Sequence, residues 1–243
     1  MKTLIFATGA ALLSVLACAA PSTAADPLVL SDVAWQASSA NGKPHLRVSR
    51  ARSNSDVAID GSRPELAGTE AALRSGGGPV SFTIVHDSGT LTCSGTLKGA
   101  FDGAGNCRFT ADPRFEAALA SRGLAPEDRD DLLAMLLVDA TIELADGLTA
   151  AGVRPKDDDD LIAAAALKVT PAYVRDLRSE AMVLTDVEDA IACKALGVDG
   201  AYVRGLAAAG YRKLSAEDVV GMKAMGVTPD YARAMNRARG SSR

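Results

Sequence analysis

The hydrophobic positions in the second half of the chain recur every 29 residues. The triplet Tyr173-Val174-Arg175 returns as Tyr202-Val203-Arg204 and then as Tyr231-Ala232-Arg233. The same period runs back to Leu144 and Phe115. Evenly spaced anchors of this kind predict a repeat array rather than unrelated helices. A leucine or methionine follows each anchor by four residues, on the same face of a helix: Leu119, Leu148, Leu177, Leu206 and Met235.

Polar residues and glycines predict where the helices of each unit begin and end. Glycine, which readily ends a helix, follows three of the anchors by eight residues at Gly123, Gly152 and Gly210. A second helix is expected to start at a capping residue in every unit: Asp128, Asp157, Asp186 and Ser215. Its last apolar positions are Val138, Leu167, Leu196 and Met225. The next anchor helix then starts at Asp112-Pro113, Thr141-Ile142, Thr170-Pro171, Asp199-Gly200 or Thr228-Pro229.

One unit of two short helices has too few large apolar side chains to fold alone. Burial of each contributes about 1.5–3 kcal/mol, whereas ordering the backbone costs about 1–2 kcal/mol per residue. Neighbouring units must therefore share a core, as in solenoids. The predicted array covers residues 112–236, with units starting near 112, 141, 170, 199 and 228, and residues 237–243 form a flexible tail.

Residues 26–111 alternate between apolar and polar positions, which is typical of strands. In the segment 80–86, Val80, Phe82 and Ile84 fall on one face. Asp87-Ser88-Gly89 predicts a tight turn, and 99–105 a longer one. Residues 28–35 and 45–52 are further expected strands. The predicted fold is α+β, with a small antiparallel β module followed by, and capping, an αα-repeat solenoid of 29-residue units.

The N-terminus has the pattern of a secretory signal peptide over residues 1–25. Lys2 precedes an apolar run, and small residues stand before Asp26. Removing this segment changes the formal net charge from −4 to −5, which excludes the strongly basic surface of a nucleic-acid binder. We expect a periplasmic or secreted protein with no membrane span in the mature chain. Lipid attachment at Cys18 is the alternative, although Leu16 fits that pattern poorly.

Three cysteines remain in the expected mature chain. Cys93 and Cys107 can pair in an oxidising compartment, which leaves Cys193. Two free buried thiols are the alternative. Because the pair is an even number of residues apart, direct opposition in a hairpin needs an odd loop or a bulge. Cys193 stands where other units have Met222, Ala164 and Met135, which predicts a buried side chain rather than a reactive thiol.

No segment carries a catalytic or metal-binding signature. His86-Asp87-Ser88 has the residue types of an acyl-transfer triad, but neighbours in a strand point to opposite faces. The segment 102–106 offers oxygens for calcium yet lacks the ligand spacing of a known loop, so we expect a plain turn. The acidic run 157–160 fits helix initiation better than a metal site. We therefore predict no enzyme activity, no cofactor and no metal.

The arginines two residues after the anchors are the best candidate binding residues. Arg175, Arg204 and Arg233 are expected to form a ladder along one face. The ladder would bind an anionic partner or, alternatively, pair with neighbouring acids. Lys194 and Lys223, which are also 29 residues apart, complete the candidate set.

Two segments of the array carry a resemblance to known proteins: 226–231, which begins Gly-Val-Thr-Pro, and 201–215. They resemble the tandem repeats of bacterial exported proteins, which also occur at the C-termini of some membrane antirepressor metallopeptidases of the beta-lactam-sensor type. There too, a Gly-rich strand segment similar to 89–109 can precede the array. The resemblance covers residues 80–235. The peptidase does not carry over, because the chain has no His-Glu-x-x-His motif. What the resemblance implies is an accessory exported module.

Two functional hypotheses follow. The first is an exported, non-enzymatic interaction protein that binds a protein or cell-envelope partner through its helical surface. The second is a sensor in which the N-terminal β module binds a small ligand or ion and the repeats transmit the signal.

Overall fold

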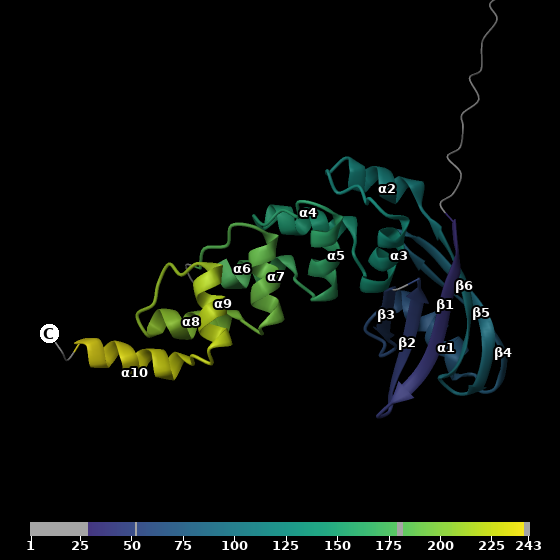
Figure 1. The fold of residues 1–243 in the computed structure, drawn as a ribbon, viewed down its shortest axis with the longest axis horizontal. Helices are drawn as coiled ribbons and strands as arrows, with labels where there is room; N and C mark the ends of the chain where they lie inside the picture. Colours follow the sequence, from purple (N-terminus) through teal and green to yellow (C-terminus); the bar gives the residue numbers. More distant parts are fainter. Residues whose placement is uncertain (1–28, 52, 179–181, 241–243) are drawn as a thin grey trace, which may run out of the picture.

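A six-stranded antiparallel sheet forms the N-terminal part of the molecule (Figure 1). The computed structural model describes residues 29–51, 53–178 and 182–240, so the expected signal peptide and Cys18 lie outside the described residues. The strands are β1 (Val29–Ala40), β2 (Lys43–Arg50), β3 (Ser53–Ala58), β4 (Gly78–His86), β5 (Gly89–Gly99) and β6 (Asp102–Ala111). Their spatial order is β3-β2-β1-β6-β5-β4, and every neighbouring pair is antiparallel. With the helices that follow, the chain is an α+β protein.

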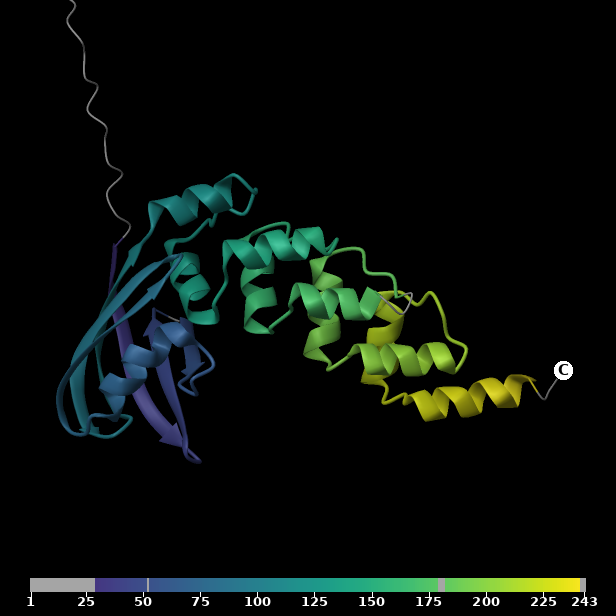
Figure 2. The same ribbon diagram turned by 180° about the vertical axis from the view of Figure 1, so that it is seen from behind.

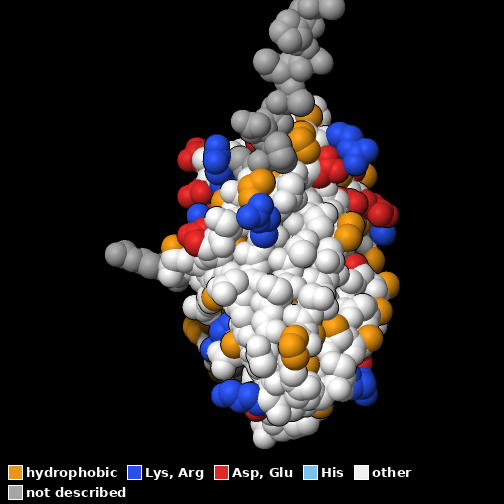
Figure 3. All heavy atoms as spheres, turned by 90° about the vertical axis from the view of Figure 1, so that its right-hand side faces the viewer, with side chains coloured by type: hydrophobic (Ala, Val, Ile, Leu, Met, Phe, Trp, Pro, Cys, Tyr) orange, Lys and Arg blue, Asp and Glu red, His pale blue; other side chains and the backbone are white. Residues whose placement is uncertain are grey.

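One face of the sheet is buried and the other is open to solvent. In β4, Phe82 and Ile84 are buried while Ser81 and Thr83 are exposed, which confirms the predicted alternation. Helix α1 (Ala67–Arg74) and the short 3-10 helix η1 (Pro64–Leu66) pack against β4 on the buried side. Figure 3 looks at the end of the molecule formed by the sheet, where uncharged polar side chains and backbone occupy most of the central area.

The hairpin of β5 and β6 places Cys93 directly opposite Cys107, and the two are disulfide-bonded. The register shifts between Leu97 and Gly99, so a bulge, rather than an odd loop, brings the two cysteines opposite each other. The longer turn predicted over 99–105 is wrong, because strand β6 already begins at Asp102.

The glycines of this hairpin face a tryptophan. A side chain at Gly95 or Gly105 would collide with the Trp35 indole, whose Nε1 donates a hydrogen bond to the Ser94 carbonyl oxygen at 3.1 Å. Glycine is therefore needed here for close packing in strands rather than for a turn.

Three elements of the sheet module were not expected from the sequence. Strand β2 ends at Arg50, and β3, η1 and α1 occupy a region in which we predicted no strand or helix. Helix α1 buries only Thr69 and Leu73, so its hydrophobic pattern is too sparse to be recognised.

Nine helices follow in the described part of the chain, and each of two sets starts at intervals of 29 residues. The first set is α2 (Pro113–Ala120), α4 (Ile142–Ala150), α6 (Pro171–Arg178), α8 (Gly200–Ala208) and α10 (Pro229–Gly240). The second set is α3 (Arg129–Val138), α5 (Asp158–Ala166), α7 (Val187–Ala195) and α9 (Ala216–Ala224).

The predicted ends of these helices are confirmed. Every predicted cap accepts a hydrogen bond from a backbone N–H of its helix: Asp112, Asp128, Thr141, Asp157, Thr170, Asp186, Asp199, Ser215 and Thr228. The glycines predicted to end helices adopt positive φ, as a left-handed cap requires.

The two sets of helices form two layers along the molecule (Figures 1 and 2). Helices α2, α4, α6, α8 and α10 pack in succession, and so do α3, α5, α7 and α9. One buried cluster runs without a break from the sheet through α2 and α3 to Leu161 and Ala165 of α5. A second cluster covers α4 to α10. Helix α3 itself packs against β3, β5 and β6.

Several side chains expected in the core are exposed. Leu167, Leu196 and Met225 are 37, 41 and 76% exposed, because they cap the ends of α5, α7 and α9 instead of facing the neighbouring unit. Tyr231 is 56% exposed, whereas Phe115 and Tyr202 are buried. Residues 237–240, which we assigned to a tail, continue α10. None of the described helices is long and apolar enough to cross a membrane.

Candidate functional site

A cleft of about 830 Å³ lies where the sheet meets the helical array; we call it the junction cleft. One wall is β3 and the segment 60–63 that follows it. The opposite wall comes from the end of α3, from α4 and from the connection between α5 and α6, including Val138, Leu144 and Pro171. Both modules therefore contribute to one concave surface.

Arg63 fixes the relation between these walls. Its guanidinium donates to the carbonyl oxygens of Leu136 and Leu137 at 2.9 and 2.7 Å, at the C-terminal end of α3. It also pairs with Glu65 at 2.6 Å. Since cations are favourable at helix C-termini, this contact holds α3 against the segment after β3.

His86 and Ser88 lie beside the cleft with Asp139, a combination that resembles a catalytic relay. His86 Nδ1 is 3.0 Å from Ser88 Oγ, and His86 Nε2 is 3.3 Å from Asp139 Oδ1. The Ser88 hydroxyl, however, belongs to a fully buried residue, so no substrate can reach it. Burial lowers the pKa of His86, and its Nε2 is buried without a well-aligned hydrogen bond. The relay has its carboxylate at the surface and its hydroxyl in the core, which is unsuited to nucleophilic catalysis.

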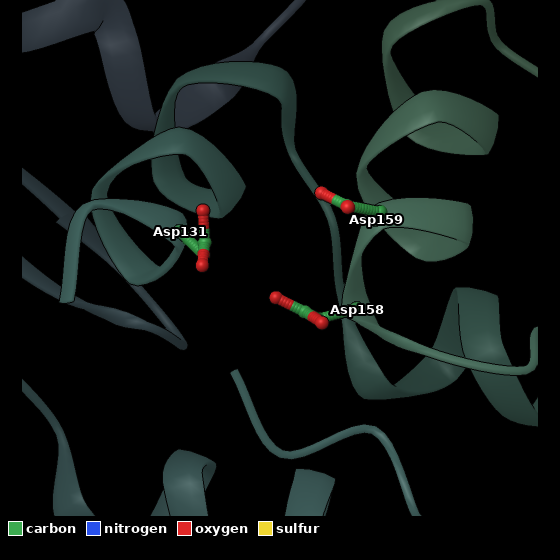
Figure 4. Close-up of side chains that lie close together, drawn as sticks. All are labelled: Asp131, Asp158 and Asp159. Carbon is green, nitrogen blue, oxygen red and sulfur yellow. The ribbon is translucent and has the colours of Figure 1, made fainter. Parts of the chain in front are cut away.

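Three carboxylates gather where α3 faces α5 (Figure 4). Oxygens of Asp131, Asp158 and Asp159 lie within 4.8 Å of one another, and Asp158 extends from the start of α5 towards Asp131 on α3. Asp158 is only 6% exposed, and burial raises its pKa to about 6. Burial also raises the pKa of Asp131. Carboxylates this close can share a proton or hold a hard cation.

The aspartates of the run 157–160 thus have two different roles. Asp157 and Asp160 cap α5: Asp157 Oδ1 accepts from the Asp160 N–H at 2.9 Å, and Asp160 Oδ2 accepts from the Lys156 N–H at 2.8 Å. Asp158 does not cap the helix. The equivalent positions at the starts of α7 and α9 hold the buried Val187 and Ala216. Comparison of the units could have singled out Asp158 in the sequence.

The arginines of the predicted ladder lie on α6, α8 and α10. Arg204 pairs with Asp176 of the preceding helix at 3.0 Å, and Arg233 pairs with Asp230 at 2.8 Å. Arg175 is exposed, and the described residues give it no ion pair. Two members of the ladder thus lie beside neighbouring acids, in the arrangement weighed as the alternative to an anionic partner.

Lys194 and Lys223 cover the rings of anchor tyrosines. The ammonium of Lys194 lies 4.4 Å from the centroid of Tyr173, and that of Lys223 lies 4.4 Å from the centroid of Tyr202. Each tyrosine hydroxyl also donates to a carbonyl at the end of its own unit at 2.7 Å, Tyr173 to Val198 and Tyr202 to Val227. Among the described residues, Tyr231 has neither contact. These lysines hold the two helices of one unit together, α6 with α7 and α8 with α9.

The exposed side chains of Leu167, Leu196 and Met225 make a second surface feature, which we call the apolar row. Each follows the last residue of α5, α7 or α9, and these helices pack in succession. The equivalent residue in α3 is Val138, the last residue of that helix. It is half-buried because it packs against the core shared with the sheet and lines the junction cleft. The period alone identified these positions, but it could not tell which side of the helix they face.

Two further candidates have structural roles. Cys193 is completely buried, and burial raises its pKa to about 11, so its thiol is neither accessible nor ionised at neutral pH. The segment 102–106, weighed as a calcium loop or a turn, belongs to β6 and pairs with β5.

No protein-family model, curated protein or solved structure matches this chain. Its function therefore has to be inferred from the surfaces described above.

Proposed function

We propose that this chain is an exported, non-enzymatic interaction protein that binds a partner protein through its helical array. The observation that carries the proposal is the apolar row. Three large hydrophobic side chains at one repeated position are exposed on three consecutive helices of one layer. Apolar side chains that lie together on the surface of a soluble protein mark a binding site, and we propose that this row is part of one.

We further infer that helices α2 to α10 form an αα solenoid of 29-residue units. The helix starts, the caps and the tyrosine hydroxyl bonds all repeat at this interval. In such an assembly each unit contacts only its neighbours, and the stacked units present an extended surface. A side chain that recurs at one position of the unit then becomes a line of contacts for a partner.

Export and the absence of catalysis are part of the same proposal. The bonded pair Cys93 and Cys107 is compatible with an oxidising compartment, either the periplasm or the exterior. The expected leader over residues 1–25, with lipid attachment at Cys18 as the alternative, supports the same location. The closed relay of Ser88, His86 and Asp139 and the buried thiol of Cys193 favour binding over chemistry.

The test is capture from a cell-envelope extract on the immobilised chain 26–243. One variant replaces the apolar row, with Leu167→Ser, Leu196→Ser and Met225→Ser. The matched control changes the exposed residue just before each of these, with Ala166→Ser, Ala195→Ser and Ala224→Ser. We expect the control to retain the wild-type partner and the row variant to lose at least nine-tenths of it.

A third variant, Arg175→Glu with Arg204→Glu, examines the arginine ladder. Since Arg204 already pairs with Asp176, we expect this variant to capture the partner as wild type does. Equal capture by the row variant, the control and wild type would show that the apolar row is not the binding surface.

A further inference from the structure

Strand β3 is the edge strand of the sheet on the side of the helical layers (Figure 1). Its residues line the junction cleft. The Ile59 N–H donates to the Pro44 carbonyl at 3.0 Å, which fixes the alternation of hydrogen bonds between β2 and β3. In an antiparallel pair, every second residue turns its backbone groups towards the partner strand. The backbone N–H and C=O groups of Asp56 and Ala58 therefore point away from β2. In the described part of the chain, no group hydrogen-bonds to them.

The other edge strand of the sheet, β4, is less suited to pairing with an additional strand. Strand β4 contains Pro79, which has no backbone N–H, and α1 and η1 pack against this strand. Strand β3 contains no proline, and Asp56 and Ala58 are both exposed. An open strand edge of this kind is a template for pairing with another chain.

The cleft beside β3 provides room and side-chain contacts for one more strand. Paired strands lie about 4.8 Å apart, and ligand clefts commonly enclose about 300–1,000 Å³. The volume of about 830 Å³ is within that range. Val138, Leu144 and Pro171 line the far wall and can receive every second side chain of an extended segment.

The charges around the cleft favour a basic occupant. Arg63 is already engaged by Glu65 and by α3, and Asp56 is neutralised by Arg47 at 2.8 Å. Lys168 lies near Asp60 and lowers the pKa of that carboxyl, although the hydrogen bonds from Ser62 lower it more.

Two acids of the cleft keep an uncompensated charge. Glu143 is exposed, and the described residues give it no ion pair. Within the described residues, Asp139 pairs with His86 alone, and the lowered pKa of His86 keeps that ring neutral at pH 7. A lysine or arginine of an incoming segment would meet both carboxylates.

We propose that β3 accepts an additional strand from a partner protein, an extended segment with a lysine or arginine that pairs with Asp139 and Glu143. A second copy of this chain is a poor occupant, because its own β3 contains no lysine or arginine that could pair with these carboxylates. The site is separate from the apolar row and stands independently of it.

The experiment uses the chain 26–243 and a fluorescein-labelled peptide, Thr-Val-Thr-Lys-Thr-Val-Thr-Val, in which Lys is on the same face as the valines, with fluorescence anisotropy as the readout. We expect saturable binding that is at least tenfold tighter than binding of the same peptide with Glu in place of Lys. Asp139→Asn with Glu143→Gln should remove that preference.

Two N-methylated peptides test strand pairing without altering the protein. Methylation of alternate residues in one register blocks the N–H groups that face β3, and methylation in the other register leaves them free. One peptide should lose binding at least tenfold and the other should bind within about twofold of the parent. Hydrogen exchange at the Asp56 and Ala58 amides should slow at least tenfold when the parent peptide is bound.

Ala58→Pro removes one outward donor of β3, and Ser81→Pro is the matched control on the opposite edge strand. Ala58→Pro should weaken the peptide at least tenfold and Ser81→Pro should not, with circular dichroism showing that both are folded. Equal loss with both N-methylated peptides, or no binding of the Lys peptide up to 1 mM, would overturn strand addition and leave the apolar row untouched. A dimer of the free chain that Ala58→Pro converts to monomer would identify a second copy as the occupant and overturn the partner proposal.

Discussion

The sheet and the helical array differ in the sequence separation of the residues that are in contact. In the sheet, Val29 pairs with Thr110, so the first and last strands of the module lie side by side and must fold together. In the array, the contacts run within one unit, as when Tyr173 bonds to Val198, or between neighbouring units, as when α6 packs against α8. Loss of one sheet contact should therefore weaken the whole module, whereas loss of one array contact should act locally.

The boundary in packing does not coincide with the change from strands to helices at residue 112. The core of the sheet continues through α2 and α3 and ends at Leu161 and Ala165 of α5, while Ala164 of the same helix belongs to the second cluster. Helix α5 is thus shared between the two cores. A change in secondary structure along a sequence does not by itself mark a cooperative folding unit.

The largest effect is expected from Gly105→Val in the sheet. A Cβ at this position would lie 2.6 Å from Trp35 Nε1 and would also collide with the Ser94 carbonyl. Overpacking against backbone should lower the free energy of unfolding by about 3 kcal/mol or more, measured by urea denaturation. Gly99→Ala, where a Cβ would meet nothing within 4 Å, is the control and should cost less than about 1 kcal/mol. Similar losses for both variants would contradict the role given to Trp35.

Loss of the disulfide is expected to lower the stability almost as much as Gly105→Val. Replacing Cys93 and Cys107 together by Ala should lower the free energy of unfolding by about 3 kcal/mol, since the bond closes a loop between residues 14 apart. The loss should appear in the transition followed by Trp35 fluorescence. Dithiothreitol should reproduce it in the wild type and should have no further effect in the double variant. An unchanged transition midpoint would show that the β5–β6 hairpin does not need the bond.

Asp158→Asn tests the shared helix between the two cores. The pKa of Asp158 is raised by burial to about 6, above its ordinary value of 3.8, so the folded state holds this proton more tightly than the unfolded state. The stabilisation is complete below pH 3.8 and is lost as the pH rises through 6. At pH 7.5 the variant should therefore be more stable than wild type by about 2 kcal/mol, and at pH 4 the difference should nearly vanish.

Calcium distinguishes the two uses of the acidic cluster. If Asp131, Asp158 and Asp159 only repel one another, 5 mM CaCl₂ should leave the melting temperature of the wild type unchanged, and the stability gain of Asp158→Asn should remain. A rise in the wild type alone would assign a cation to the cluster.

The smallest effect on stability concerns the tyrosine hydroxyl contacts within the units. Tyr202→Phe removes the hydroxyl that donates to Val227 at 2.7 Å and should cost about 1 kcal/mol. The same change at the exposed Tyr231 should stay within about 0.5 kcal/mol, because none of the described residues accepts a bond from its hydroxyl. Equal values for the two variants would mean that the hydroxyl bonds do not stabilise the array.

The sequence predicted the array better than the sheet because helix ends are decided locally. A cap such as Asp128 or Thr141 bonds to a backbone N–H only two or three residues away, so its own neighbourhood identifies it. The pairing of Cys93 with Cys107 and the bulge that it needs were also predictable, since both lie in one hairpin.

What the sequence could not reveal depends on distant partners. The order of β3 in the sheet and the path of α1 are set by tertiary packing, and their short segments carry little pattern of their own. The exposure of Tyr231 and Met225 follows from what lies beside them in space, although their sequence contexts match those of other units. The junction cleft combines segments on both sides of residue 112, so neither module alone suggested it.

The tyrosine contacts have a consequence for how such a chain can change in evolution. The ring, the hydroxyl, the lysine and the carbonyl of these contacts all belong to one unit, as Tyr173, Lys194 and Val198 illustrate. Because one unit contains every part of the contact, a tandem duplication of 29 codons within the array copies the contact whole. The length of the molecule can therefore vary by whole units without a compensating mutation, and the distance between the junction cleft and the far end of the array can be adjusted to a partner in steps of one unit.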